Sequence, residues 1–251
     1  MLLLALAATR ALADPGIALD QMGAKICGSP HLRLTPRRDP TPEDRARGLA
    51  LLHALRAATA KLHSADAAIA AGYAPFLPEV PQEVYHFVHR AATDAEYAGG
   101  FDAARPGALL FVKRGGRFDL VGAMYSAPEN ADAAALDARV PLSLAHWHAH
   151  ANVCLPQGVT LEDLARGDFG AAHPHLAGRL PERDGRDRRT NRRYGFMADG
   201  RFGFEGRIAT RADCDAAGGQ FFPQAWGWMT HVYPYAGDDP DVAFGLSVPA
   251  P

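Results

Sequence analysis

The spacing of apolar residues predicts one long helix near the start of the chain. Between residues 42 and 71, leucine and alanine recur every three or four positions, with Leu52 and Leu55 on the same stripe. Thr41 and the proline after it are typical of a helix cap and first turn. Gly72 follows as the residue type that commonly ends a helix. We therefore predict a helix from about residue 42 to residue 71.

After this helix the pattern changes to short apolar runs separated by turn residues. The run over 108–126 is interrupted by Gly115 and Gly116, which predict a hairpin. Residues 127–141 are rich in alanine and acids and predict a loop with a helical turn. The other strand-like runs are 84–90, 142–154 and 220–235. The expected fold class is α+β: an N-terminal helix followed by a mainly antiparallel β-sheet, in a single domain over residues 41–251.

The sequence before this domain predicts export. Residues 1–13 resemble a signal peptide, because a short apolar run leads to the small-x-small pattern at the cleavage site. A simple apolar helix is the alternative interpretation. Residues 14–40 are rich in proline and predict an extended N-terminal arm. No apolar run is long enough to span a membrane, so the sequence indicates a secreted or periplasmic protein.

Composition adds one exclusion and one unusual segment. Of the 251 residues, 48% are apolar and 22% charged, with a formal net charge of -2 and a sequence pI of about 6.6. A nucleic-acid-binding domain usually carries a basic excess, so the balance argues against such a partner. The segment near 175–205 is dense in Arg, Asp and Gly. It predicts a charged surface excursion, with anion binding or partner docking as the alternative.

The stretch LAHWHAHANVC, residues 144–154, places three histidines at alternate positions. On a strand, His146, His148 and His150 would share one face. His148 and His150 can reach one metal ion from that face, whereas His146 lies a further step along. Imidazole is the commonest metal-binding side chain, because its neutral form offers a lone pair near physiological pH. The pair therefore favours a metal site over a polar strand face with no special role.

Two more histidines lie in strand-like segments, His86 in VYHFVHR and His231 in GWMTHVYPY. We predict one mononuclear copper or zinc site held by His148, His150 and His231, with His86 as a fourth ligand or a base. Both a metal-dependent enzyme and a metal-handling protein are compatible with this pattern.

Three further residues are candidates for orienting the ligands or a bound water. His146 and Asn152 continue the face of the histidine pair on either side. Tyr125 lies in the second strand of the predicted hairpin, in GAMYS, and could donate a hydrogen bond near the pocket.

The three cysteines leave two interpretations open. Cys154 and Cys214 each adjoin a strand-like segment, and an exported protein meets oxidising conditions, which favours a disulfide between them. Alternatively, Cys154 is a thiolate ligand beside the histidines. Cys27 lies in the proline-rich arm and receives no role.

Other catalytic motifs are absent: the chain has no GxSxG, HExxH, P-loop, GxGxxG or CxxCH sequence. A second hypothesis is a metal-independent module that binds a small molecule. On the last strand, Trp226 and Trp228 are expected on the face opposite His231. The pocket of such a module would be lined by the aromatic residues Phe221, Phe222, Trp226, Trp228, Tyr233 and Tyr235.

Several sequence blocks recur together in other proteins. They are HF, FD-x-x-x-P-x-x-LL, LVG-x-x-Y, WH-x-H-x-N-x-C, C-x-x-x-GG-x-F and GWM-x-HVYP, found here in scattered positions over residues 45–235. In these blocks the chain resembles a group of uncharacterised secreted bacterial proteins. The resemblance implies that the histidines of the predicted site belong together and that two cysteines pair, and it names no reaction. Many sequences of that group carry Glu where this chain has Met124, so a role of that Glu does not transfer.

Overall fold

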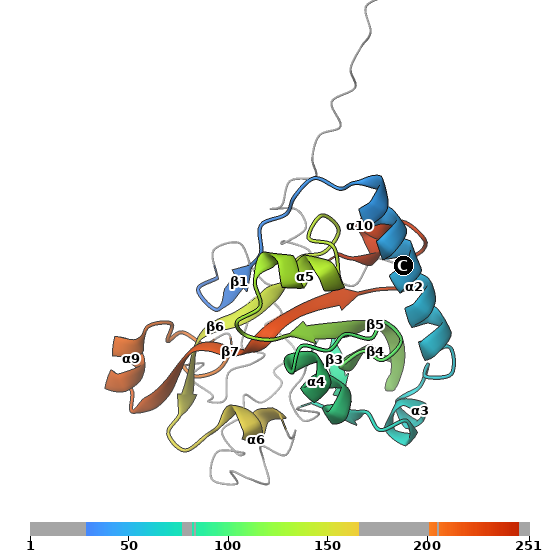
Figure 1. Ribbon diagram of the computed structural model, residues 1–251. Coiled ribbons are helices and arrows are strands. Elements are labelled where there is room, and N and C mark those ends of the chain that lie inside the picture. Colours follow the sequence, from blue (N-terminus) through green and yellow to red (C-terminus); the bar gives the residue numbers. More distant parts are fainter. Residues whose placement is uncertain (1–28, 77–81, 83, 166–200, 205, 246–251) are drawn as a thin grey trace, which may run out of the picture.

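The protein folds around one seven-stranded sheet (Figure 1). A computed structural model describes residues 29–76, 82, 84–165, 201–204 and 206–245. The strand order is β1-β6-β7-β5-β4-β3-β2, and every pairing is antiparallel. Because a helix precedes the main strands, the predicted α+β class is confirmed. The predicted signal peptide, Cys27 and most of the charged excursion lie outside the described residues.

The strands arise where the sequence predicts them, with two additions, β1 and β2. In the β4–β5 hairpin, Gly115 and Gly116 have φ values of 55° and 85°, the left-handed conformation that a two-residue turn requires. The first of these, β1, comes from the arm before the first helix and pairs with β6, and the second, β2, pairs with β3 at the opposite edge of the sheet. The bounds are β1 Leu32–Leu34, β2 Ala74–Pro75, β3 Tyr85–Val88, β4 Ala108–Arg114, β5 Arg117–Ala127, β6 His148–Pro156 and β7 Gly219–Val232.

The predicted long helix is divided into α2, Pro42–Thr59, and α3, Ala65–Ala70. Ser64 starts the second helix, because its hydroxyl accepts a hydrogen bond from the N–H of Ala67 as an N-cap. Gly72 then ends the segment with φ 92°. Further helices are α4 Arg90–Tyr97, α5 Ala133–Arg139, α6 Leu161–Ala165, α9 Arg211–Ala216 and α10 Pro240–Ala243. Among the helices in the described ranges, none is both long and apolar enough to cross a membrane.

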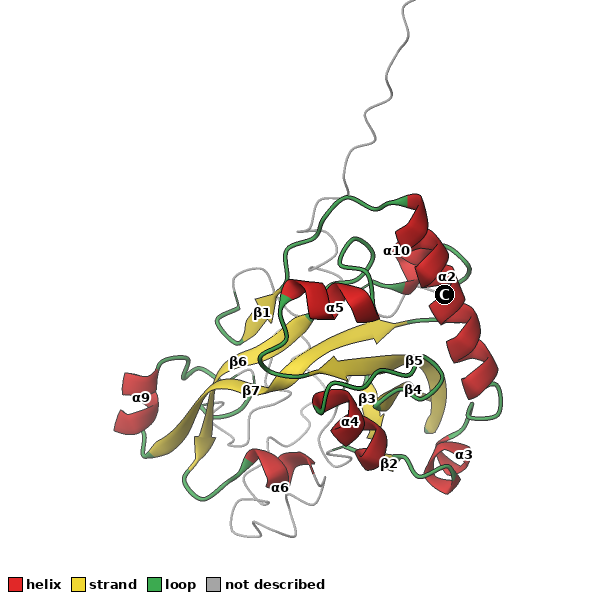
Figure 2. Ribbon diagram, viewed as in Figure 1, coloured by secondary structure: helices red, strands yellow, loops and turns green. Residues whose placement is uncertain are grey.

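Helices cover one face of the sheet (Figure 2). Leu52 and Leu55 of α2 and Leu136 of α5 are at most 1% exposed, and they pack in one cluster with Phe111 and Tyr125 of the sheet. We call this side the helix-covered face. Strand residues in the alternate positions point to the opposite face, where they form a second buried cluster of Ala108, Leu110, Met124, Met229 and Tyr233.

A buried carboxylate joins α4 to the helix-covered face. Glu96 is 2% exposed and accepts hydrogen bonds from the backbone N–H groups of Gly107 and Ser126, at 3.0 and 2.8 Å. Burial raises the pKa of Glu96 to about 7, and the two donors oppose that shift. Both donors belong to the hairpin or its approach, so Glu96 fixes the position of α4 against β4 and β5.

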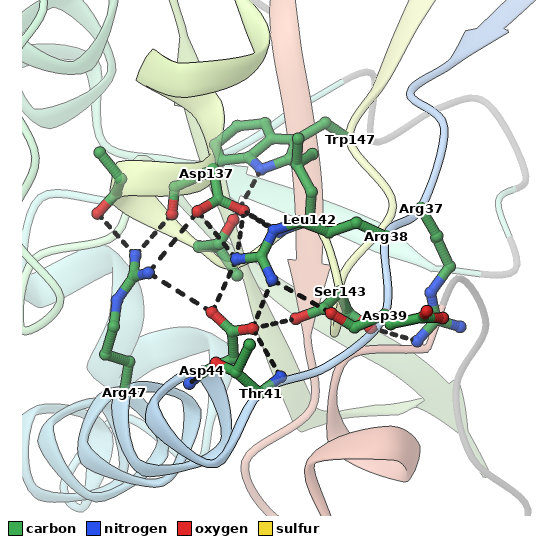
Figure 3. Close-up of polar contacts among 12 residues, drawn as sticks. Arg37, Arg38, Asp39, Thr41, Asp44, Arg47, Asp137, Leu142, Ser143 and Trp147 are labelled. Carbon is green, nitrogen blue, oxygen red and sulfur yellow. Dashed lines mark hydrogen bonds and ion pairs between the residues drawn. The ribbon is translucent and has the colours of Figure 1, made fainter.

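An ion-pair network fastens the chain before α2 to both α2 and α5 (Figure 3). Asp44 accepts two hydrogen bonds from the guanidinium of Arg38, one of them at 2.7 Å, and Arg38 also bonds Asp137 of α5 at 3.0 Å. The Ser143 hydroxyl donates to Asp44 at 3.0 Å. Thr41 and Asp44 also bond each other's backbone N–H, which forms a capping box. Hydrogen bonding by Arg38 holds the pKa of Asp44 well below its usual range.

Replacing this carboxylate should destabilise the protein in a pH-dependent way. We expect Asp44→Asn to lower the free energy of unfolding by about 2 kcal/mol at pH 7, because hydrogen bonds to a charged group are lost. Folding lowers the pKa of Asp44, so the carboxylate contributes its full stabilisation above the unfolded pKa of about 4. This stabilisation is lost progressively as the pH falls from there toward the lower pKa of the folded state. Urea unfolding at pH 7, 4 and 3 should therefore show that the difference in free energy of unfolding between wild type and variant decreases as the pH falls.

The matched control is Asp94→Asn, which removes an exposed carboxylate that pairs with Arg90 within α4. This variant should change stability by less than about 0.5 kcal/mol at every pH. A gap between wild type and Asp44→Asn that stays constant down to pH 3 would contradict the assigned role of the carboxylate.

Candidate metal centre

An irregular pairing of β6 with β7 sets the positions of two predicted ligands. His148 pairs with Met229 and His150 pairs with Ala225, so one residue of β6 lies opposite three residues of β7. Within this bulge Trp226 has φ 62°, a left-handed conformation that large residues rarely adopt. The imidazole rings of His148 and His150 lie beside the bulge, with their centres 6.0 Å apart.

His231 and His86 reach the same place from other strands. The ring centre of His231, on β7, is 5.1 Å from that of His148. The ring centre of His86, on β3, is 5.5 Å from that of His231. Strands β5 and β4 separate β7 from β3, so a flat sheet would hold these two residues about 14 Å apart. The sheet therefore curls toward this side, and we call His86, His148, His150 and His231 the histidine cluster.

The spacing of the rings agrees with that of imidazoles that share one ion. Two imidazoles bound to a tetrahedral zinc at about 2.0–2.1 Å have ring centres roughly 5 Å apart. His231 meets this spacing with His148 on one side and with His86 on the other. The ring centres of His148 and His150 are farther apart, at 6.0 Å. His231 therefore occupies the central position of the cluster.

Burial keeps the imidazoles of His86, His148 and His150 neutral. His148 and His231 are 3% and 7% exposed, whereas His86 and His150 are partly exposed. Burial lowers the pKa of His86 and that of His150 to about 4. Burial, with a smaller contribution from His231, lowers the pKa of His148 well below its usual value. A neutral imidazole keeps one ring nitrogen free of hydrogen, which is the form that binds metal ions.

Hydrogen bonds orient two of the rings. His86 is hydrogen-bonded to the backbone of Val84, a contact that opposes the lowering of its pKa and so identifies the imidazole as the donor. Metal-binding histidines usually donate one ring N–H in this way, which fixes the other nitrogen toward the ion. The Tyr233 hydroxyl lies 3.4 Å from Nδ1 of His231. In the described structure Nδ1 of His148 is buried without a hydrogen-bond partner, which is a costly state for a polar atom.

The cluster does not already have the geometry of a ligated ion. Within the described residues, no three His, Cys, Asp or Glu side chains are arranged as a ready metal site. The rings are close enough to share an ion but tilted relative to one another, at 51° for His86 and His231 and 78° for His148 and His231. Binding would require the rings to turn about their side-chain torsions so that their nitrogens converge.

The two residues predicted to flank the pair differ in their surroundings. His146 precedes β6, is 7% exposed and lies close enough to His148 to influence its pKa. Burial lowers the pKa of His146, and the backbone of Thr35 opposes that shift. Asn152 instead has φ 52° and donates from its amide nitrogen to the carbonyl of Pro30 at 2.6 Å. Its side chain thus fastens β6 to the residues before β1 and does not orient the cluster.

Tyr125 is not brought to the cluster. Its ring is fully buried on the helix-covered face, and its hydroxyl donates to the carbonyl of Ala103 at 2.6 Å. Side chains alternate along a strand, so its neighbour Met124 takes the opposite face, where it pairs with His231. The expectation that Tyr125 bonds to the pocket is therefore corrected.

The aromatic residues of β7 do not line a single pocket. Trp228 packs in the helix-covered core, whereas Trp226 lies against Phe204 with ring centres 5.1 Å apart. The bulge between them interrupts the strand alternation, so the prediction that both tryptophans share a face is wrong. Phe204 was not predicted, because no strand pattern marks it, yet its ring centre is 5.0 Å from that of His150. The other residues are dispersed over separate contacts: Phe221, Phe222, Tyr233 and Tyr235.

The predicted disulfide between Cys154 and Cys214 is confirmed. It joins the distal part of β6 to α9, the helix that directly precedes β7. Both cysteines are completely buried, and the bond removes Cys154 from the candidate ligands. The covalent link therefore holds together the two strands that contribute three of the four histidines.

Removing this disulfide should destabilise the fold without a change in the helix-covered core. The sequence separation of 60 predicts a loss of about 4 kcal/mol in the free energy of unfolding for the Cys154→Ser, Cys214→Ser variant. Thiol titration of the denatured, unreduced wild type should find one reactive thiol, that of Cys27. The Cys27→Ser control should abolish this thiol and keep wild-type stability, and finding three thiols in the wild type would contradict the assignment.

Comparison of the chain with protein-family models, with curated proteins and with solved structures finds no match. The chemistry of the centre is therefore argued from its own residues alone.

Proposed function

We propose that the protein binds one copper or zinc ion through the histidine cluster and does so outside the cytoplasm. One observation carries the proposal: three strands that are not all neighbours contribute imidazoles at ring-centre distances of 5.1 and 5.5 Å. Curling a sheet to bring neutral polar rings together has no evident benefit for packing. A shared ion would supply a partner for Nδ1 of His148, which is buried without a hydrogen bond in the described structure.

Each histidine would have a distinct part in this site. His231 is central and would bind with His148, which is the most deeply buried of the four. His86 would complete a three-nitrogen site, and its hydrogen bond to the backbone of Val84 favours a fixed ring. His150 is the fourth candidate. With three protein ligands the ion would keep an open position for water or substrate, whereas four would favour storage or transfer of the ion.

The location outside the cytoplasm is supported by two independent features. The Cys154–Cys214 disulfide is of a kind that persists in oxidising compartments. Residues 1–13 have the pattern of a signal peptide. Copper and zinc sites in such proteins would be loaded after export, when the disulfide has joined the two halves of the cluster.

Elemental analysis of the exported protein, purified without chelator, tests the proposal. Wild type should carry close to one copper or zinc ion per chain, and protein stripped of metal should rebind one equivalent. The variant His148→Ala, His231→Ala should bind neither metal, because it lacks both the central imidazole and its nearest neighbour. The bound ion should also raise the midpoint of thermal unfolding, since it binds only the folded state.

The matched control is His53→Ala, His63→Ala, which removes two exposed histidines of α2 and of the turn after it. This control should retain the full metal content, and circular dichroism should confirm that both double variants are folded. Stripped wild-type protein that rebinds neither metal would overturn the proposal. In that case a small organic ligand that raises the unfolding midpoint would favour the metal-independent binding module.

A further inference from the structure

Two methionines lie directly across the strands from the two central histidines. Met124 of β5 pairs with His231 of β7, and Met229 of β7 pairs with His148 of β6. In an antiparallel sheet, residues that pair in this way point to the same face, with Cβ atoms about 4.5–5.5 Å apart. Both methionines belong to the buried cluster on the histidine side and are only 7% and 5% exposed.

A methionine at these positions brings a possible ligand, which a leucine would not. The side chain is unbranched and flexible, and its thioether sulfur is a soft, polarisable donor. Met229 is also two residues from His231 on the same strand, so each methionine adjoins that central ring. The thioethers therefore adjoin the same two imidazoles that lie closest together.

The charge of the surroundings restricts which ion fits. The cross-strand partners of the four histidines in the described structure are uncharged: Leu32, Leu34, Leu110, Met124, Ala225 and Met229. A divalent ion buried among neutral donors keeps its full charge in a desolvated site, which is costly. A monovalent ion carries half that charge, and its desolvation cost is correspondingly lower.

We infer that the preferred ion is copper in its monovalent state, held by His148 and His231 together with the thioether sulfurs of Met124 and Met229. Thioether sulfur is a soft, uncharged ligand of the kind that suits Cu(I), and an uncharged donor set favours a monovalent over a divalent ion. His86 and His150 stand beside these four ligands as further nitrogen donors. The inference rests on the proposed metal function and narrows it to one ion and one mixed sulfur–nitrogen ligand set.

The test compares two metals on the same variants. Cu(I) affinity is measured under ascorbate by competition with a chromophoric Cu(I) chelator, and zinc affinity by competition with a zinc indicator. Met124→Leu, Met229→Leu should weaken Cu(I) binding by roughly tenfold or more while zinc affinity changes far less. Leucine preserves the volume of methionine, so the variant should remain folded.

X-ray absorption at the copper edge gives a second readout. Wild type should show copper–sulfur scattering, which should become copper–selenium scattering in protein labelled with selenomethionine and should disappear in the leucine variant. Leu109→Met serves as the matched control, because it places a thioether on the helix-covered face of β4. This control should leave Cu(I) affinity at the wild-type value.

The outcomes separate this inference from the proposed function. If the methionine variant keeps wild-type Cu(I) affinity, or if bound copper shows no sulfur neighbour, the thioether assignment is overturned. Loss of both metals in His148→Ala, His231→Ala would then still support the histidine site. If wild type binds neither Cu(I) nor zinc, the inference and the proposed function fail together.

Discussion

The unequal pairing of β6 with β7 is the constraint on which the rest of the candidate centre depends. One residue of β6 faces three of β7 between the His148–Met229 and His150–Ala225 pairs. The extra residues turn Trp226 out of the regular alternation, and β7 bends at that point. A flat sheet would hold His231 and His86 about 14 Å apart, and a second irregularity lies between their strands, in the β4–β5 ladder at Leu110 and Phe111. Two irregular ladders therefore adjoin the histidines: the β6–β7 bulge beside His148 and His150, and the β4–β5 shift next to the strand that carries His86.

The two faces of the sheet divide stability from chemistry. On the helix-covered face, leucines and aromatic residues of α2, α5 and the central strands form the larger core, and polar groups there have partners, as Glu96 and Tyr125 do. On the other face, His148 keeps a buried nitrogen without such a partner in the described structure. Groups of this kind destabilise a fold unless something else satisfies them, and they tend to cluster at functional sites. The ion-pair network around Asp44 stabilises the helix side, where it joins the chain before α2 to α2 and α5.

Much of the fold could be predicted from periodicity, and so could the membership of the histidine cluster. The glycine pair at 115–116 identifies a hairpin, and histidines on strand-like segments were expected to meet. Two kinds of feature could not be predicted in this way. A bulge changes strand alternation without a local signal in the sequence. The prediction that Trp226 and Trp228 share a face of the sheet is wrong for this reason. Strand order is a long-range property, and Tyr125 was assigned to the site without knowledge of the face that α4 and α5 would cover. Ser64, in contrast, was a readable helix start within the run predicted as one helix.

The disulfide has a consequence for how this protein could change over evolutionary time. Cys154 and Cys214 close the connection between β6 and β7 with a covalent bond. The entropic cost of closing a loop grows only slowly with the length of the loop. Because the disulfide already joins the two ends of this connection, lengthening it has little effect on the pairing of β6 with β7. Apart from Gly203 and Phe204, which contact Cys154 and His150, residues inside the closed connection can therefore be inserted, deleted or exchanged with little effect on the spacing of His148 and His231. The link makes this connection a permissive place for sequence divergence, so new recognition surfaces could arise beside a conserved arrangement of ligands.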